Sequence, residues 1–205
     1  MGPTDMSHPN DKESTKPPLS PAAPSRRRIR WYLAGAGMIV ASIVLFRLPT
    51  HDQDSRNTAR TKATGTALAT SVESFLTESG YLPVPEKEGS SLDLGFVTDE
   101  GPGVQVLRIL TGKDPKRNPR GVPYLRTREG KDRKNGLIYE EGTGKVTGMF
   151  DPWGNPYQMV FDTDYNEEIV VNIMGKPETV KGQHVLVYSA GKDRKLGTAD
   201  DVRSW

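Results

Sequence analysis

The pattern of hydrophobic and polar positions divides the chain into stretches of different kinds. Residues 1–28 contain almost no large apolar side chain and are rich in proline, serine and charge, which is typical of a disordered tail. An uncharged apolar run from Trp31 to Phe46 follows, and after it comes a stretch with helical spacing. From Gly136 onward the apolar residues form period-two and β-branched clusters, which are typical of strands.

The apolar run predicts a membrane-spanning helix. About 16 residues rise roughly 24 Å as a helix, and Ile29 and Leu48 extend the run towards a hydrocarbon core near 30 Å. The basic sequence RRRIR stands directly before it, and such a flank stays in the cytoplasm. We therefore expect residues 29–48 to be a single-pass anchor in the inner (cytoplasmic) membrane. The N-terminus is then cytoplasmic and the rest of the chain periplasmic, or otherwise extracytoplasmic.

A cleaved signal peptide is the competing interpretation of the same run. The sequence after the run is RLPTHDQD, which contains no small-x-small cleavage site. The sequence therefore favours an uncleaved anchor.

The segment from Ser55 to Ser79 has the three- and four-residue spacing of an amphipathic helix. Its apolar residues fall mostly on one stripe, namely Ala59, Ala63, Ala67, Leu68, Val72, Phe75 and Leu76. Pro49 separates this helix from the membrane segment, and Gly80 supplies its stop. Residues 85–136 are less regular, with Val104–Leu110 as one or two turns of helix.

Five segments in the last third of the chain predict antiparallel strands. They are LIYEE, KVTGMF, YQMVF, EIVVNIM and HVLVYSA, and turn residues separate them. A helix followed by a run of strands predicts an α+β fold, in which the helix stripe packs on one face of a small antiparallel sheet. We expect one exported domain over residues 52–205, with 85–136 as a variable region or insertion.

Composition excludes several classes of function. The hydrophobic fraction is 34%, which is low for a chain that is folded throughout and agrees with an unpacked tail. The net charge of +2 does not indicate a polyanion binder. The absence of cysteine removes disulfides and thiolate sites, and the three histidines are too scattered to favour a catalytic triad or a zinc site.

One segment, residues 112–136, is locally basic. It is a solvated loop in the simpler interpretation, and in the other it docks an acidic partner or anionic lipid. Nucleic acid is not expected there, because Tyr124 is its only aromatic residue and cannot form a stacking platform alone.

Oxygen donors are dense at the carboxyl end, YSAGKDRKLGTADDVRSW. Asp193, Asp200 and Asp201 lie within nine residues, and Gly191 and Gly197 let the backbone turn so that carbonyl groups also point inward. Calcium takes six to eight oxygen ligands of this mixed kind, and a cation would relieve the repulsion between the carboxylates. The alternative is an acidic, glycine-rich tail that is simply solvated.

A second acidic cluster, DTDYNEE, begins at Asp162 and lies between two predicted strands. It resembles the start of an EF-hand loop, but Glu167 occupies the position where that loop needs glycine. A hairpin turn is the favoured interpretation, and a weak second cation site that uses Asp162 and Asp164 is the alternative.

The motif DPWGNPYQ, residues 151–158, predicts a structural corner. We expect Trp153 to bury its ring under the turn and Tyr157 to begin the next strand. Asp151 has no histidine neighbour in the sequence, and the chain lacks a nucleophile elbow, a P-loop and a dinucleotide fingerprint. We therefore predict no catalytic residues and no enzyme.

Together DPWGNPYQ, the strand ending YSAGKD, and the terminal GTADDVRSW resemble the C-terminal domain of the major pseudopilin (G-type) of type II secretion systems. The helix that runs into SGYLPV is similar to that family's long helix, so the resemblance covers roughly residues 55–84 and 148–205. The resemblance implies a pseudopilin-like fold with calcium bound in the C-terminal loop. It implies side-chain ligands at Asp193, Asp200 and Asp201, and backbone carbonyl ligands at Ala190, Lys195 and Thr198.

The chain departs from the family pattern at two places. Arg194 stands where a glycine is usual, so its side chain must point away from the ion. The prepilin signature is missing, and the apolar run contains no glutamate. These departures favour a permanently anchored accessory protein or a diverged paralogue.

The expected function is a structural or accessory component of a type II secretion or type IV pilus-like system. Its partners would be other pseudopilins or secretion-machinery proteins, and the membrane, with homo-oligomers as a further expectation. The alternative is a membrane-tethered calcium-binding envelope or adhesion module. A hydrolase that uses Asp162 and Asp164 is disfavoured, because these residues lie in a predicted turn without a recognisable cleft.

Overall fold

The computed structural model describes residues 50–85, 93–173 and 175–205. The expected tail, the expected anchor and Pro49 lie outside these residues, so those predictions stay predictions. Pro49–Trp205 is one compact unit. Within the described part of the chain, no helix combines the length and the apolar character that crossing a bilayer requires.

Helix α2 covers Thr50–Ser79, so it begins before the predicted Ser55 and ends where predicted. Gly80 stops it in the left-handed region at φ +79°, and its N–H donates to the carbonyl of Leu76 over 2.8 Å. Leu68, Val72 and Phe75 are buried, which confirms the second half of the predicted stripe.

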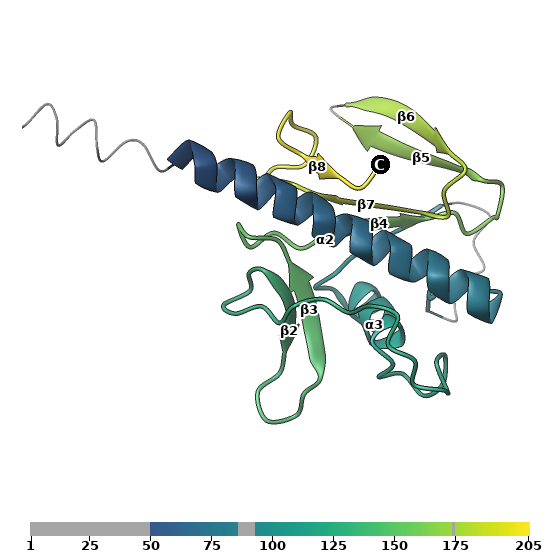
Figure 1. The fold of residues 1–205 in the computed structure, drawn as a ribbon. Helices are drawn as coiled ribbons and strands as arrows, with labels where there is room; N and C mark the ends of the chain where they lie inside the picture. The colour runs from purple at the N-terminus through teal and green to yellow at the C-terminus, as the bar shows by residue number, and fades with distance from the viewer. Residues whose placement is uncertain (1–49, 86–92, 174) are drawn as a thin grey trace, which may run out of the picture. The chain divides into compact units, whose positions relative to one another are not determined.

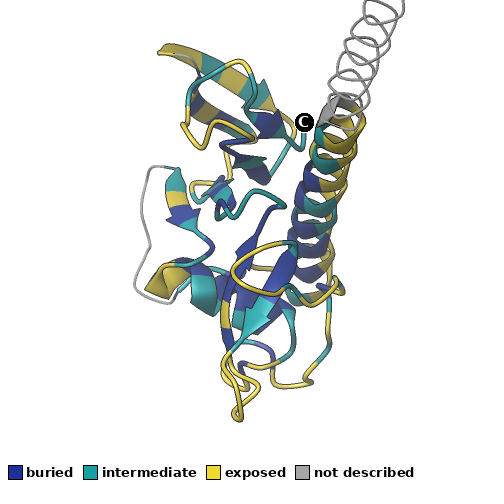
Figure 2. Ribbon diagram, turned by 90° about the vertical axis from the view of Figure 1, so that its left-hand side faces the viewer, coloured by how far each residue is buried: buried dark blue, intermediate teal, exposed yellow. Residues whose placement is uncertain are grey.

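The first half of the predicted stripe is wrong. Ala59 and Ala63 are exposed, whereas Thr61 and Gly65 are buried. The buried face continues backwards from Leu68 in steps of three and four residues, which lead to these two small residues and not to the alanines. Figure 2 shows the resulting division of α2 into a buried and an exposed face.

The main sheet has four antiparallel strands in the order β1 (Leu94–Val97), β4 (Gln158–Phe161), β7 (Val185–Ser189) and β8 (Val202–Arg203). Helix α2 packs against β7 and β8 (Figure 1). The pairings of β1 with β4 and of β4 with β7 bring the middle and the carboxyl end of the chain into one sheet, to which β8 adds its edge.

Two hairpins flank this sheet. One joins β2 (Gly136–Tyr139) to β3 (Val146–Phe150), and the other joins β5 (Glu168–Ile173) to β6 (Lys176–Lys181). All five predicted strands are present, as β2, β3, β4, β5 and β7, whereas β1, β6 and β8 were not predicted.

Helix α3, Gly101–Leu110, is longer than the one or two turns expected for this region. It packs on β1 and β3 and buries four large side chains, Val106, Leu107, Ile109 and Leu110. A side chain at Gly103 would meet the carbonyl oxygen of Val97 at 1.9 Å, so only glycine allows this approach. Residues 94–110 are thus part of the core, and Leu125 joins them from the loop that follows.

The main core lies between α2, α3 and the sheet, and its largest fully buried side chains include Phe75, Leu82, Leu137, Met149, Tyr157, Met159 and Phe161. A smaller cluster, built on Ile169, Val171, Ile173 and Leu186, fastens the β5–β6 hairpin to the sheet. The predicted α+β class, with a helix packed on small antiparallel sheets, is confirmed.

Candidate functional site

The corner at residues 151–155 is built around a buried carboxylate. Asp151 is 0% exposed, and its Oδ1 accepts hydrogen bonds from the backbone N–H groups of Trp153 and Asn155, each over 2.8 Å. Its Oδ2 accepts from Asn155 Nδ2 over 2.8 Å and from the hydroxyl of Ser189 over 2.5 Å. Both oxygens of this buried carboxylate are thus satisfied by protein donors, so Asp151 has a structural role.

Trp153 is not fully buried, so the expectation for it is met only in part. The residue is half-buried, whereas Asp151, Asn155 and Tyr157 are buried. The carboxylate of Asp151 lies on the inside of the turn, where it accepts from the N–H groups of Trp153 and Asn155. Tyr157 comes directly before β4, as expected, and burial raises the pKa of its phenol far above the usual range.

The corner is attached to the C-terminal loop, residues 190–201. Asn155 Nδ2 donates to the carbonyl oxygen of Gly191 over 2.6 Å, and the hydroxyl of Ser189 accepts from the N–H of Gly191 over 3.2 Å. A side chain at Gly191 would meet the carbonyl oxygen of Asp200 at 2.1 Å. The loop therefore closes on itself at Gly191, and only glycine permits this closure.

The carboxylates of the predicted site accept hydrogen bonds from the loop backbone. Asp200 Oδ2 accepts from the N–H of Asp193 over 2.8 Å, Asp193 Oδ1 from Lys195 over 2.8 Å, and Asp201 Oδ2 from Gly197 over 2.8 Å. The hydroxyl of Thr198 donates to Asp200 Oδ1 over 2.6 Å and, with the N–H of Asp193, lowers the pKa of Asp200.

One oxygen of the loop has no hydrogen-bond partner. Asp201 Oδ1 is buried and unpaired. The negative charge of Asp201 acts on Tyr188, whose pKa is raised by burial first and by this carboxylate second. A buried, unsatisfied carboxylate oxygen is a candidate ligand atom, since leaving it without a partner is costly.

The three predicted carbonyl ligands lie in the same loop. Ala190 is 7% exposed. The Lys195 carbonyl accepts from the Thr198 hydroxyl over 3.3 Å, and the Thr198 carbonyl accepts from the N–H of Asp201 over 3.4 Å. Both distances are long for hydrogen bonds, so these two carbonyl oxygens are only weakly bonded to protein donors.

Arg194 adopts φ +61°, in the left-handed region that favours glycine. This agrees with the glycine that the family resemblance led us to expect there. The Arg194 guanidinium donates from Nη2 to the carbonyl oxygen of Trp153 over 2.8 Å. Its charge is therefore held at the corner.

The closest gathering of carboxylates lies elsewhere. Among the described residues, Asp93, Asp162 and Asp164 form the one group of three potential metal ligands whose ligand atoms lie within 4.8 Å of one another. Asp193, Asp200 and Asp201 do not form such a group. Sequence reasoning missed Asp93, which stands before β1, far from the DTDYNEE cluster in the chain. Only the pairing of β1 with β4 brings them together.

The DTDYNEE turn joins β4 to β5, and these two strands pair with other strands and not with each other, so the predicted hairpin turn is wrong. Asp162 is 0% exposed and accepts from the N–H groups of Asn166 and Glu167, each over 3.0 Å. Glu167 adopts φ +63° at the position where an EF-hand has glycine. Burial raises the pKa of Asp162, and the neighbouring Asp164 raises it further. Asp93 Oδ1 is buried without a hydrogen-bond partner.

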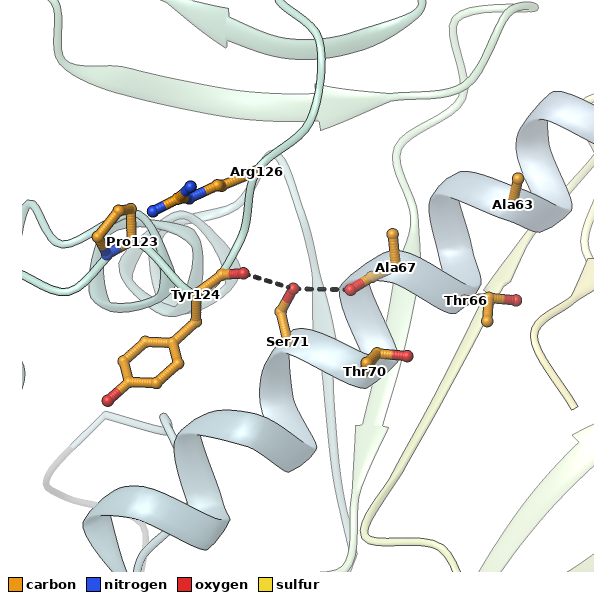
Figure 3. Close-up of a pocket in the computed structure, with 8 residues that line it drawn as sticks. All are labelled: Ala63, Thr66, Ala67, Thr70, Ser71, Pro123, Tyr124 and Arg126. Atoms are coloured by element: carbon orange, nitrogen blue, oxygen red, sulfur yellow. Dashed lines mark hydrogen bonds between the residues drawn. The ribbon is translucent and has the colours of Figure 1, made fainter.

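A shallow groove of about 650 Å³ lies between α2 and the segment 123–126 (Figure 3). Ser71 links the two sides of the groove, because its hydroxyl donates to the carbonyls of Ala67 on α2 and Tyr124 on the other segment over 2.7 and 3.2 Å. Small residues of α2 line one wall, and Arg126 is the one charged residue of the lining. The lining contains no carboxylate or histidine, so it offers contact surface and no acid or base.

Comparison of the chain with protein-family models, with curated proteins and with solved structures gives no match.

Proposed function

We propose that the chain is a structural or accessory component of a type II secretion or type IV pilus-like system. Residues 29–48 anchor it in the inner membrane with a cytoplasmic N-terminus, and the folded domain lies on the periplasmic side. The proposal assigns no reaction to the chain. Its partners are pseudopilins or other secretion-machinery proteins, and further copies of the chain itself.

One observation carries the proposal. The two motifs behind the family resemblance, DPWGNPYQ and the terminal loop, are joined by the buried hydrogen bond from Asn155 to the carbonyl of Gly191. Both lie beside the first half of a long helix that packs on an antiparallel sheet, since Lys192 of the loop pairs with Asp54 over 2.6 Å and the hydroxyl of Tyr157 donates to the carbonyl of Thr61 over 3.5 Å. This arrangement agrees with a pseudopilin-like domain whose C-terminal loop is a fixed part of the scaffold.

Calcium is the cofactor of this proposal. Asp193, Asp200 and Asp201 would supply carboxylate oxygens, and Ala190, Lys195 and Thr198 would supply carbonyls. The loop fits a hard cation in its donor chemistry, because these are all oxygen donors and Asp201 Oδ1 is buried without a partner. A bound ion would neutralise the carboxylates and fix the loop that leads into β8.

A membrane-tethered calcium-binding envelope or adhesion module is the second candidate. It is favoured by the N-terminal sequence, which lacks the prepilin signature and has no glutamate in the apolar run. In this case the domain and its cation would be the same, but the partners would lie outside any secretion system.

Deletion of the gene and site-specific crosslinking distinguish the secretion-system component from the calcium-binding module. The chain contains no cysteine, so Ala63→Cys, on the exposed face of α2, gives a single crosslinking position. We expect deletion to abolish export of a reporter substrate, and Ala63→Cys to crosslink to pseudopilins. Lys145→Cys, in the exposed β2–β3 turn, is the matched control position. Normal export together with complexes that contain no secretion component would favour the second candidate.

A further inference from the structure

Asp93, Asp162 and Asp164 gather where β1 and β4 meet, and they are called the β1–β4 cluster below. Leu94 pairs with Phe161 in the antiparallel register, so Asp93 and Asp162 are the residues just beyond these strand ends and stand opposite each other. One ligand oxygen of each aspartate lies within 4.8 Å of the others. Oxygens that bind one calcium ion at about 2.3–2.6 Å lie no more than about 5 Å apart, so a single ion can reach all three carboxylates.

Two of these carboxylates have oxygens that are withdrawn from water. Asp162 is 0% exposed, and each of its oxygens accepts one backbone N–H of the turn that follows. Asp93 Oδ2 accepts from the N–H of Val170 over 3.1 Å, whereas Asp93 Oδ1 is buried and has no hydrogen-bond partner. This oxygen comes from the β1 side, so it is not one of the groups that close the turn. A buried oxygen without a donor is costly, and a bound cation would satisfy it.

No basic side chain neutralises the β1–β4 cluster. The carbonyl of His184 accepts from the N–H of Asp162 over 3.1 Å, but the His184 ring contacts Glu73. Lys181 is paired with Glu168. Among the residues that the structure describes, none of the three carboxylates forms an ion pair. Like charges on opposite residues of an antiparallel pair destabilise it, so the cluster requires a cation from solution.

We propose that the β1–β4 cluster is a second, weaker calcium site, in which Asp93, Asp162 and Asp164 each supply a carboxylate oxygen and water completes the coordination. The inference does not depend on the membrane anchor or on secretion. The cluster supplies three protein ligands where the terminal loop offers six, so we expect a Kd of about 0.1–1 mM, the range of extracellular calcium modules. A calcium concentration that just saturates the terminal loop would leave this site largely empty.

The ion would strengthen the attachment of the β5–β6 hairpin to the main sheet. Asp93 already holds β5 through the N–H of Val170. The apolar cluster around Leu186 attaches the same hairpin to the sheet. Calcium between Asp93 and the DTDYNEE turn would add a third link, from the beginning of β1 to the segment that leads into β5.

Equilibrium dialysis of the full chain in detergent, with radioactive calcium from about 1 µM to about 10 mM, counts the bound ions. We expect two ions per chain, one of them weakly bound. Asp193→Asn combined with Asp200→Asn removes two carboxylates from the terminal loop and should leave only the weak ion. The Kd measured in this loop variant then belongs to the β1–β4 cluster.

Two further substitutions and one control, each made in the loop variant, assign the weak ion. Asp164→Asn, at an exposed position, and Asp93→Asn, whose amide oxygen can still accept from Val170, should each raise the Kd at least about tenfold, because calcium affinity follows the number of carboxylate ligands. Glu168→Gln is the matched control, since it removes one negative charge from the same acidic segment at a side chain that pairs with Lys181. It should change the Kd by less than about twofold, because its charge is screened by solvent.

Thermal unfolding separates ion binding from a merely structural role of Asp164. In a chelator, Asp164→Asn should melt no lower than its parent, because it removes one of three mutually repelling carboxylates. In about 10 mM calcium it should melt lower than its parent, because its folded state binds the ion less tightly. A midpoint that falls by the same amount in both conditions would overturn the inference.

Two dialysis results would also overturn the inference. One is the absence of bound calcium from the loop variant up to about 10 mM. The other is a Kd that Asp93→Asn and Asp164→Asn leave unchanged, which would place the weak ion elsewhere. A parent that binds one ion, kept by the loop variant and lost in Asp164→Asn, would instead refute calcium in the terminal loop and would support the β1–β4 cluster.

Discussion

Asn155 and Gly191 are joined by a hydrogen bond of 2.6 Å, from the side-chain amide of the first to the carbonyl oxygen of the second. Both residues are buried. The same Nδ2 atom also donates to Asp151 Oδ2, which accepts from the hydroxyl of Ser189 at the end of β7. One amide group thus holds the corner before β4 to the loop after β7.

Replacement of Asn155 by alanine should therefore destabilise the domain strongly. The change removes a donor from a buried carboxylate and from a buried carbonyl, so we expect the free energy of unfolding of residues 49–205 to fall by about 2–3 kcal/mol. Urea unfolding measures this. Asn172→Ala, at an exposed position of β5, should change it by less than about 0.5 kcal/mol. Similar losses in the two variants would contradict the role of Asn155.

Gly103 provides a second matched pair of substitutions. In Gly103→Ala the new methyl group would overlap the carbonyl oxygen of Val97, so α3 must move away from β1. We expect a loss of at least about 2 kcal/mol in urea unfolding. Gly101→Ala, in the first turn of the same helix, meets nothing within 4 Å and should be neutral or slightly stabilising. Equal free energies of unfolding for the two variants would mean that α3 can move away from β1 at no cost.

The strands that sequence reasoning found are those with apolar or β-branched clusters. The burial of β5 alternates along EIVVNI, and β7 is buried along most of VLVYS, so both give a clear signal. Strand β6, KPETVK, has no buried residue and contains Pro177, and β8 is only two residues long. Neither carries enough apolar pattern to be distinguished from a loop.

The candidate site was predictable where its residues are close in sequence. The closely spaced oxygen donors of the terminal loop identify it, and the Asp-Pro and Gly-Asn-Pro turns identify the corner at 151–155. What the sequence does not contain is the contact between them, because the bond from Asn155 to Gly191 depends on the register of β4 beside β7. The same holds for Asp93, which only the sheet brings to Asp162.

Calcium should stabilise the domain, and variants at the two acidic clusters tell which one binds it. An ion that binds only the folded state at about 100 times its Kd adds about 2.7 kcal/mol, so chelation should lower the thermal midpoint of residues 49–205. If the terminal loop binds calcium, Asp193→Ala and Asp200→Ala abolish the shift and Asp164→Ala keeps it. The reverse result would place the ion at Asp93, Asp162 and Asp164. Equal midpoints with and without calcium would refute the assignment of calcium ligands.

Thr198 should make the domain sensitive to acid through Asp200. Its hydroxyl is the largest cause of the lowered pKa of Asp200, ahead of the N–H of Asp193. A carboxylate whose pKa is lower in the folded than in the unfolded state contributes stability above its ordinary pKa of 3.8 and loses it as the pH falls through the folded-state value. The contribution should therefore be present above about pH 4 and disappear in stronger acid.

Thr198→Val removes this hydrogen bond, so its thermal midpoint in a chelator should lie below that of the parent above about pH 4, and the two should converge at lower pH. The raised pKa of Asp162 has the opposite effect on stability. Its contribution is lost as the pH rises from the ordinary pKa of a carboxylate to the raised value in the folded state. Its effect is the same in both proteins and cancels in the difference. Thr179→Val, on the exposed strand β6, is the control and should show no convergence. A gap between Thr198→Val and the parent that stays constant into strong acid would mean that Thr198 stabilises the loop without acting on Asp200.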